Sequence, residues 1–431
     1  MAKKFNLTQK SLMSVHAMRA IIELFTSTFL TSYILSITPD NVLGSGIINI
    51  GIFYISWFTV YTILYYTISH FVDKSNRVSF LRIGILVTTC LMIALVFWGD
   101  IISHWIVLAG SLCGISDAFY YSSYLIMRNE LNSRRSMKKY NITYYAIQNS
   151  IKIIVPTILG YLIDIATYSH IAIYFVVISL IQFSITFMIV SKRPENSNFS
   201  MKGYFKYLKR NKEVRSKIKY TYLNSFLGGF KTTYKIVVTI LTIYTFKTNF
   251  SLGILSSVFS IVAMLILMTY KKFDNSPKVN KFIIYLILGI VPFVSCILLV
   301  VTLNITTLII YNICLTIAIA FSDYLGTVER DTIIKNLGGF DYIAEHQCLY
   351  EIITSSTRII AFGLFIVIGV IGHIVAFKIL LLFLLILNPI KFMIMYKQRL
   401  IRKEYEGKEK QQSPEQIVES LAISSETTPQ V

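Results

Sequence analysis

The chain has 431 residues, of which 55% are hydrophobic and only 15% are charged, and its formal net charge is +19. Soluble globular proteins carry about 25% charged residues, so this chain has too little charge to cover the surface of a soluble fold of this length. The composition therefore excludes an ordinary soluble protein and predicts an all-α polytopic membrane protein.

Long apolar runs follow one another along the whole chain. The hydrocarbon core of a bilayer is about 30 Å thick, which a helix of about 20 apolar residues can span. Runs of this kind cover residues 14–38, 45–70, 79–98, 104–127, 141–163, 170–190, 219–245, 251–270, 281–300, 304–327, 346–370 and 374–396. The first run shows no small-residue cleavage site, so we expect it to be retained. The sequence thus predicts twelve transmembrane helices in two sets of six.

Basic residues concentrate in every second turn between these runs. They cluster in the N-terminal tail, at residues 74–82, 128–139, 192–217, 271–281 and 330–335, and again after residue 396. The intervening turns hold little beyond Lys247, with Lys378 just inside a run. Loops with excess Lys and Arg face the cytoplasm, so both termini are expected there. This placement accounts for most of the net charge without nucleic acid as a partner.

Four segments follow from this pattern. We expect a first six-helix half at residues 1–190, a basic cytoplasmic linker at 191–218, a second half at 219–396 and a polar cytoplasmic tail at 397–431. The linker mixes Tyr204, Phe205, Tyr207 and Leu208 with Lys and Arg. Such a segment either lies along an anionic inner leaflet or forms a solvated connection, and the sequence favours neither.

The two halves carry matching charges at a constant distance. Asp117 and Lys152 in the first half are each followed, 206 residues later, by an equivalent charge, at Asp323 and Arg358. A constant offset at two charged positions predicts two parallel structural repeats.

Twelve spans divided six and six by a long basic linker resemble the major facilitator superfamily. A motif adds to the likeness: that family often carries Gly-x-x-x-Asp-Arg/Lys-x-Gly-Arg-Arg/Lys between spans 2 and 3. Residues 69–78 read SHFVDKSNRV, which matches at Asp73, Lys74 and Arg77. The resemblance implies a major facilitator fold over residues 14–396 and a conformational latch in this cytoplasmic loop. A second motif of its drug antiporters, Gly-Pro-x-x-Gly-Gly, is met only at Pro156 and Gly160, which disfavours that assignment.

Ionisable residues inside the spans are the candidates for function, because each is costly in a bilayer unless it is paired or hydrated. In the family, spans 1, 4, 7 and 10 line the transport cavity. On that basis we expect substrate or proton binding at Glu23, Asp117, Lys231, Lys235 and Asp323. Asp117 and Lys152 each lie about 18 Å from their own membrane surface, near the midplane.

A second group is expected to form ion pairs or to gate the cavity: Arg19, Lys152, Glu351 and Arg358. Arg19 and Glu23 are four residues apart, so they could equally form a structural pair within one helix. For Lys152 and Arg358 a structural or gating ion pair is favoured over substrate binding, because the resemblance places spans 5 and 11 at the edge of the cavity.

The sequence as a whole predicts a secondary active transporter that works by alternating access. The mixed charges favour a polar, zwitterionic or amphiphilic small molecule. We expect proton coupling, because a buried carboxylate can take up a coupling proton, and Asp117 and Asp323 are the candidates for that role. A lipid or peptide exporter, a flippase, a drug efflux pump and a non-transporting receptor or immunity protein remain alternatives. No P-loop, H-E-x-x-H or G-x-S-x-G motif occurs, and the five cysteines lack metal-ligand spacing, so no enzyme activity, cofactor or metal is expected. The expected setting is a monomer in the plasma membrane.

Overall fold

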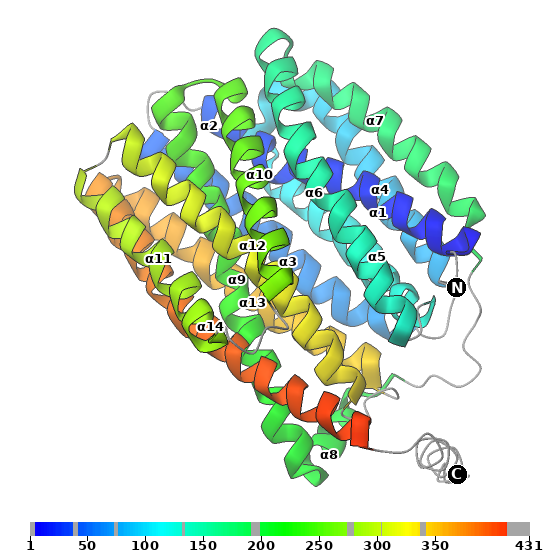
Figure 1. The fold of residues 1–431 in the computed structure, drawn as a ribbon. Coiled ribbons are helices and arrows are strands. Elements are labelled where there is room, and N and C mark those ends of the chain that lie inside the picture. The colour runs from blue at the N-terminus through cyan, green and yellow to red at the C-terminus, as the bar shows by residue number, and fades with distance from the viewer. Residues whose placement is uncertain are drawn as a thin grey trace.

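A computed structural model of the chain describes residues 5–37, 42–72, 76–131, 134–190, 199–273, 280–302, 304–336 and 342–411. Within these ranges the regular structure is helical throughout. Figure 1 shows a bundle in which the helices of the first half lie beside those of the second.

The first half follows the predicted order of spans. Its helices are α1 (Leu7–Leu24), continued by the π-helix η1 (Phe25–Phe29) and α2 (Leu30–Ser36); η3 (Val42–Gly46) and α3 (Ile47–Val72); α4 (Arg77–Trp98) and the short 3₁₀ helix η4 (Gly99–His104); α5 (Ile106–Leu131); α6 (Arg134–Ile165); and α7 (Tyr168–Ile185) with η5 (Thr186–Met188).

The second half repeats this order after a short helix, α8 (Met201–Arg210). It contains α9 (Lys212–Phe246), α10 (Asn249–Phe273), α11 (Lys281–Thr302), α12 (Ile305–Asn336), α13 (Ile343–Ile371) and α14 (Ile374–Gln411). The predicted boundaries differ at two places, since α9 begins at Lys212, inside the expected linker, and α14 continues past residue 396.

Each of the twelve predicted spans coincides with one of these helical segments. Among the described residues, ten helices are by themselves long and apolar enough to cross a membrane. The segment α1–η1–α2 and the helix α5 are not among the ten. These two carry Arg19, Glu23 and Asp117 together with many Ser, Thr and Tyr residues, which lower their hydropathy. The prediction of an all-helical, polytopic membrane fold is confirmed.

Two pairs of helices make the most extensive contacts between the halves. Helix α3 packs against α13, and α6 packs against α10. At the α6–α10 crossing a Cβ added to Gly253 would lie 2.3 Å from the carbonyl oxygen of Pro156, and one added to Gly160 would lie 2.3 Å from that of Asn249. Only glycine permits such close backbone contact. This contact lies near the end of α6 that is remote from the basic turn at 128–139.

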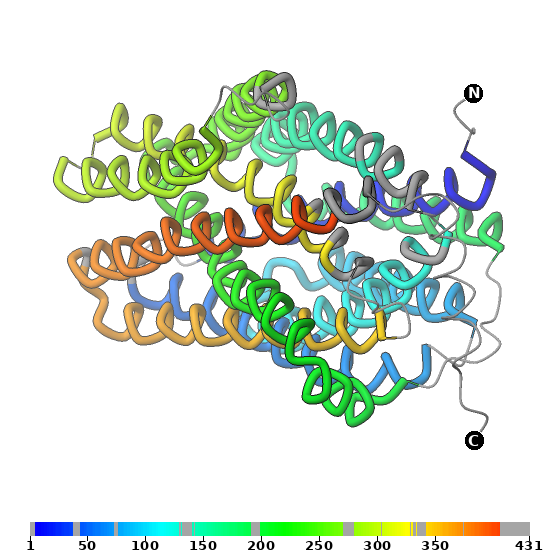
Figure 2. The backbone as a smooth tube through the Cα atoms, turned by 60° about the horizontal axis from the view of Figure 1, so that its bottom comes forward, coloured from blue at the N-terminus to red at the C-terminus, as the bar shows by residue number. Residues whose placement is uncertain are grey.

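The start of the first described helix and the end of the last lie at the same end of the bundle (Figures 1 and 2). The first turns of α1 and the last turns of α14 point the same way in both views (Figures 1 and 2). This arrangement requires an even number of crossings, as the pattern of basic turns predicts.

Helix α8 packs on the protein through its apolar face. Tyr204 and Leu208 are buried there, and the Tyr204 hydroxyl lies 2.5 Å from that of Tyr222 and 3.1 Å from His346 Nδ1. Burial raises the pKa of Tyr204, so this phenol stays protonated at neutral pH. The linker helix is therefore docked on α9 and α13, and its expected position along the inner leaflet stays a prediction.

Candidate functional site

A buried polar network centres on Arg19 in the first half. Its guanidinium forms ion pairs with Asp117 of α5 and, at 3.1 Å, with Glu23 one turn along α1. The same group donates to Thr88 Oγ1 at 2.6 Å and to Ser116 Oγ at 3.1 Å. Arg19 is 4% exposed and Asp117 is 8% exposed, so the pair is shielded from solvent. This network ties α1, α4 and α5 together.

Both carboxylate oxygens of Asp117 are hydrogen-bonded, whereas Glu23 accepts from Arg19 and Tyr121 through a single oxygen, Oε1. Trp57 Nε1 donates to the second oxygen of Asp117 at 2.9 Å, while Tyr121 donates its hydroxyl to Glu23. The network continues through His16, whose ring lies within hydrogen-bonding distance of the Tyr120 and Tyr144 hydroxyls, at 3.1 and 2.7 Å. Aromatic side chains thus extend the network to α6. We call Arg19, Glu23, Asp117 and their hydrogen-bond partners the closed network.

The second half contains an equivalent ion pair in a more open setting. Lys231 of α9 lies 2.5 Å from Asp323 of α12, and their side chains are 25% and 24% exposed. In each half the first helix supplies a base and the fourth an acid, as expected of two parallel repeats. The two pairs differ in surroundings, because the Arg19–Asp117 pair is enclosed and the Lys231–Asp323 pair faces open space.

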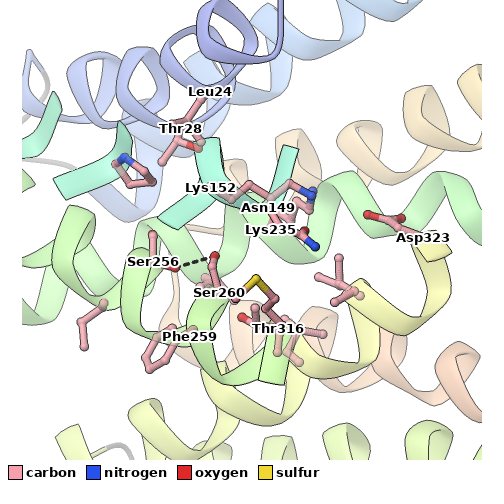
Figure 3. A pocket seen from close by; sticks show the side chains of 18 of the residues that line it. Leu24, Thr28, Asn149, Lys152, Lys235, Ser256, Phe259, Ser260, Thr316 and Asp323 are labelled. Atoms are coloured by element: carbon pink, nitrogen blue, oxygen red, sulfur yellow. Dashed lines mark hydrogen bonds between the residues drawn. The ribbon is translucent and has the colours of Figure 1, made fainter. Parts of the chain in front are cut away.

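That space consists of two adjoining cavities that share Asp323. The larger, of about 250 Å³, lies among α1, η1, α6, α9, α10 and α12, and Figure 3 shows Lys152 and Lys235 extending their amino groups toward the side where Asp323 lies. The smaller, of about 180 Å³, has Lys231, Arg358 and Lys391 in its wall. We call the two together the central cavity.

The central cavity has a polar and an apolar end. Asn149, Lys152, Lys235 and Asp323 form part of the polar side of the larger cavity. The apolar part of its wall comes mainly from α10 and α12, which also contribute Ser256, Ser260 and Thr316; it includes Leu255, Phe259, Met264, Leu267, Leu315 and Ile319. A concave site with a few charged groups and an apolar wall is typical of small-molecule binding.

The predicted site residues divide between the closed network and the central cavity. Lys231, Lys235 and Asp323 line the cavity, whereas Glu23 and Asp117 belong to the network and line neither of its parts. Their roles in binding remain predictions.

The four residues expected to form ion pairs or to gate the cavity also lie in different places. Arg19 forms the network, and Lys152 lines the larger cavity without a salt bridge to any described residue. Glu351 and Arg358 line the smaller cavity at the α3–α13 contact. There Glu351 accepts from Tyr61 at 3.1 Å and from Gln347 at 2.9 Å, while Arg358 lies 4.8 Å from the ring of Phe58. Both therefore connect the halves.

The loop motif is only partly visible. Asp73 and Lys74 lie outside the described residues. Arg77 is buried in the first turn of α4, which begins after the N-cap Asn76. The latch expected from the resemblance stays a prediction.

Lys391 and Trp57 are two residues of the site that the sequence-based set lacks. Lys391 is 6% exposed in α14 and lines the smaller cavity. It is an ionisable residue inside a predicted span, so the rule that selected the other candidates would also have selected it. Trp57 gives no comparable signal, because a tryptophan in an apolar run is ordinarily a packing residue.

Comparisons with known proteins agree with this architecture. A family model described as "Major Facilitator Superfamily" matches residues 20–327. No curated protein sequence matches the chain. Among solved structures, a bacterial homologue of the iron transporter ferroportin in an inward-facing state is similar, with a TM-score of 0.66 and 10% identity, over 92% of this chain and 99% of that one. A POT family transporter in complex with 5-aminolevulinic acid is also similar, with a TM-score of 0.64 and 13% identity, over 92% of this chain and 96% of that one.

Proposed function

The chain belongs to the Major Facilitator Superfamily, a family of transporters, and we propose that it moves a small molecule across the membrane by alternating access with proton coupling. The central cavity carries this proposal, because its larger part lies between the two repeats, where transporters of this construction bind their substrates. We place the protein in the plasma membrane with both termini in the cytoplasm, on the positive-inside pattern of its turns.

The contact between α6 and α10 supports alternating access. It joins the halves near the end remote from the basic turns, through backbone groups at Gly160 and Gly253. Asp164 reinforces it by accepting from the backbone N–H of Asn249 at 3.1 Å and of Phe250 at 2.8 Å. We propose that this contact closes the outer side and separates when the cavity opens outward.

The Lys231–Asp323 pair is the proposed coupling element. Asp323 belongs to both parts of the central cavity, so protons and substrate can reach the same carboxylate. Protonation of Asp323 would remove its attraction for Lys231 and release that lysine for another partner. Asp117, the other candidate from the sequence, is enclosed by Arg19 and Trp57 and is less accessible to either.

Proton flux into proteoliposomes tests the proposal. The protein is reconstituted with a pH-sensitive dye inside, and sugars, amino acids, peptides and carboxylates are added in turn under a pH gradient. We expect at least one compound to drive proton movement, and Asp323→Asn to abolish it. Asp100→Asn is the control, because Asp100 is an exposed acid outside the cavity. Proton movement of wild-type size in Asp323→Asn would remove that residue from coupling, and none with any compound would argue against proton coupling itself.

A further inference from the structure

The central cavity holds a large excess of positive charge. Among the described residues its wall contains six bases and two acids: Lys152, Lys231, Lys235, Arg330, Arg358 and Lys391 against Asp323 and Glu351. The closed network around Arg19 contributes nothing to this wall. From the sequence, Glu23 and Asp117 are expected to line the cavity and to offset its positive charge, but neither residue lies in its wall.

The two acids of the cavity do not balance this charge. Asp323 is already paired with Lys231, and both oxygens of Glu351 accept hydrogen bonds, from Tyr61 and Gln347. Lys152, Lys235, Lys391 and Arg358 make no salt bridge with any residue that the structure describes. The buried Nε of Arg358 also lacks a hydrogen-bond partner.

These cations are close enough to act on one another. The charges of Lys231, Lys152 and Arg358 act on Lys235, and that of Lys231 acts on Lys391. Among the described residues the only opposing charge on either lysine is that of Asp323, which is already paired with Lys231. Like charges that share a cavity of low dielectric constant repel, and each is costly inside a membrane unless an opposite charge or water compensates it. A bound anion would provide that compensation.

The apolar wall defines the rest of the ligand. Leu255, Phe259 and Met264 of α10 face the same larger cavity as Lys152 and Lys235. Resting on the function proposed above, we propose that the substrate is an organic anion. Its negative group binds where the two cavities adjoin, between Lys152 and Lys235 of the larger and Lys391 of the smaller, and its apolar body lies against α10 and α12. The volume of about 250 Å³ suits a compact molecule.

A matched series of ligands tests the charge directly. Binding to the purified protein in nanodiscs is measured by calorimetry with 3-phenylpropionate, 3-phenylpropanol and 3-phenylpropylamine, which share one apolar body and differ in charge. Phenyl phosphate distinguishes a phosphate group from a carboxylate, and acetate tests the need for the apolar body. We expect binding of an aromatic anion, weakened by added salt, and none of the alcohol or the amine.

Variants then locate the site. Lys235→Gln and Lys391→Gln should each weaken binding of the anion about tenfold or more, which corresponds to about 1.4 kcal/mol. Lys235→Arg and Lys391→Arg should retain most of the affinity. Lys378→Gln is the matched control, because Lys378 belongs to α14, like Lys391, and lies outside the cavity. Monodispersity by size exclusion confirms that each variant is folded.

Several results would overturn this inference: equal or tighter binding of the amine or the alcohol, no binding of any anion in the series, or equal affinity in the Gln variants and the wild type. The outcome that refutes an anionic substrate differs from the outcome that refutes transport. A protein that binds the anion but moves no compound in proteoliposomes would refute transport alone, whereas one that transports only cations or zwitterions would refute the anion alone.

Discussion

The two repeats provide a matched pair of acids on which the same substitution should have very different effects. Asp117→Asn removes the charge that faces Arg19, which is 4% exposed. Removing one partner of a buried pair costs about 3–5 kcal/mol. Arg19 keeps its bonds to Glu23, Thr88 and Ser116, so we expect the lower end of that range, about 3 kcal/mol. Asp323→Asn changes a pair that is about one quarter exposed and should cost about 1 kcal/mol or less.

Unfolding in mixed micelles can measure this difference. Cys113, Cys296 and Cys348 are buried, so a thiol-reactive dye reports their exposure as the protein unfolds. A double-mutant cycle of Arg19→Met and Asp117→Asn should give an interaction energy of about 2 kcal/mol, because residues in direct contact are coupled. Two results would contradict the assignment of the Arg19–Asp117 pair to structure and the Lys231–Asp323 pair to function. One is that the effects of Arg19→Met and Asp117→Asn on the free energy of unfolding add to within about 0.5 kcal/mol, and the other is that Asp323→Asn destabilises the protein more than Asp117→Asn.

Three further predictions concern contacts that the fold creates. Gly253→Val should prevent α6 and α10 from closing, since even a Cβ would lie 2.3 Å from the carbonyl oxygen of Pro156. An impermeant thiol reagent added outside should then label a cysteine introduced at the cavity residue Thr28 (Thr28→Cys) faster than in the protein with Gly253. Gly363→Ala is the control and should leave the labelling rate unchanged, because nothing lies within 4 Å of the added Cβ. Asp164→Ala removes two hydrogen bonds at the start of α10 and should shift the same labelling in the same direction but less; an unaltered rate would mean that this cap does not hold the closed state. Tyr204→Phe should lower the free energy of unfolding by about 1 kcal/mol, because the hydrogen bonds to Tyr222 and His346 are lost. An unchanged free energy of unfolding in a denaturant titration would show that α8 docks through apolar contacts alone.

Much of the architecture could be predicted because the bilayer imposes simple rules on a sequence. Apolar runs of about 20 residues must become helices, and basic turns must alternate with neutral ones. The repeat of Asp117 and Lys152 at Asp323 and Arg358 then indicates two similar halves. These features depend on local composition and spacing, which the sequence displays directly.

The site was less predictable, because its chemistry depends on which charged side chains the fold brings into contact. The sequence selects Asp117 and Asp323 as equivalents, yet Arg19 and Trp57 enclose the first while the second opens to a cavity. Lys391 satisfies the same sequence rule as Lys235, but only the approach of α14 to α9 and α12 brings it to the cavity wall.

What the sequence by itself determined is therefore the class of the protein, the number and order of its helices and the presence of costly charges within them. Only the tertiary structure decided how those charges are distributed. It places three of them, Arg19, Glu23 and Asp117, in a closed network and leaves the cavity wall with an excess of bases. The reason is physical: the cost of a charge in a membrane follows from the residue itself, whereas its compensation depends on neighbours that are distant in the chain.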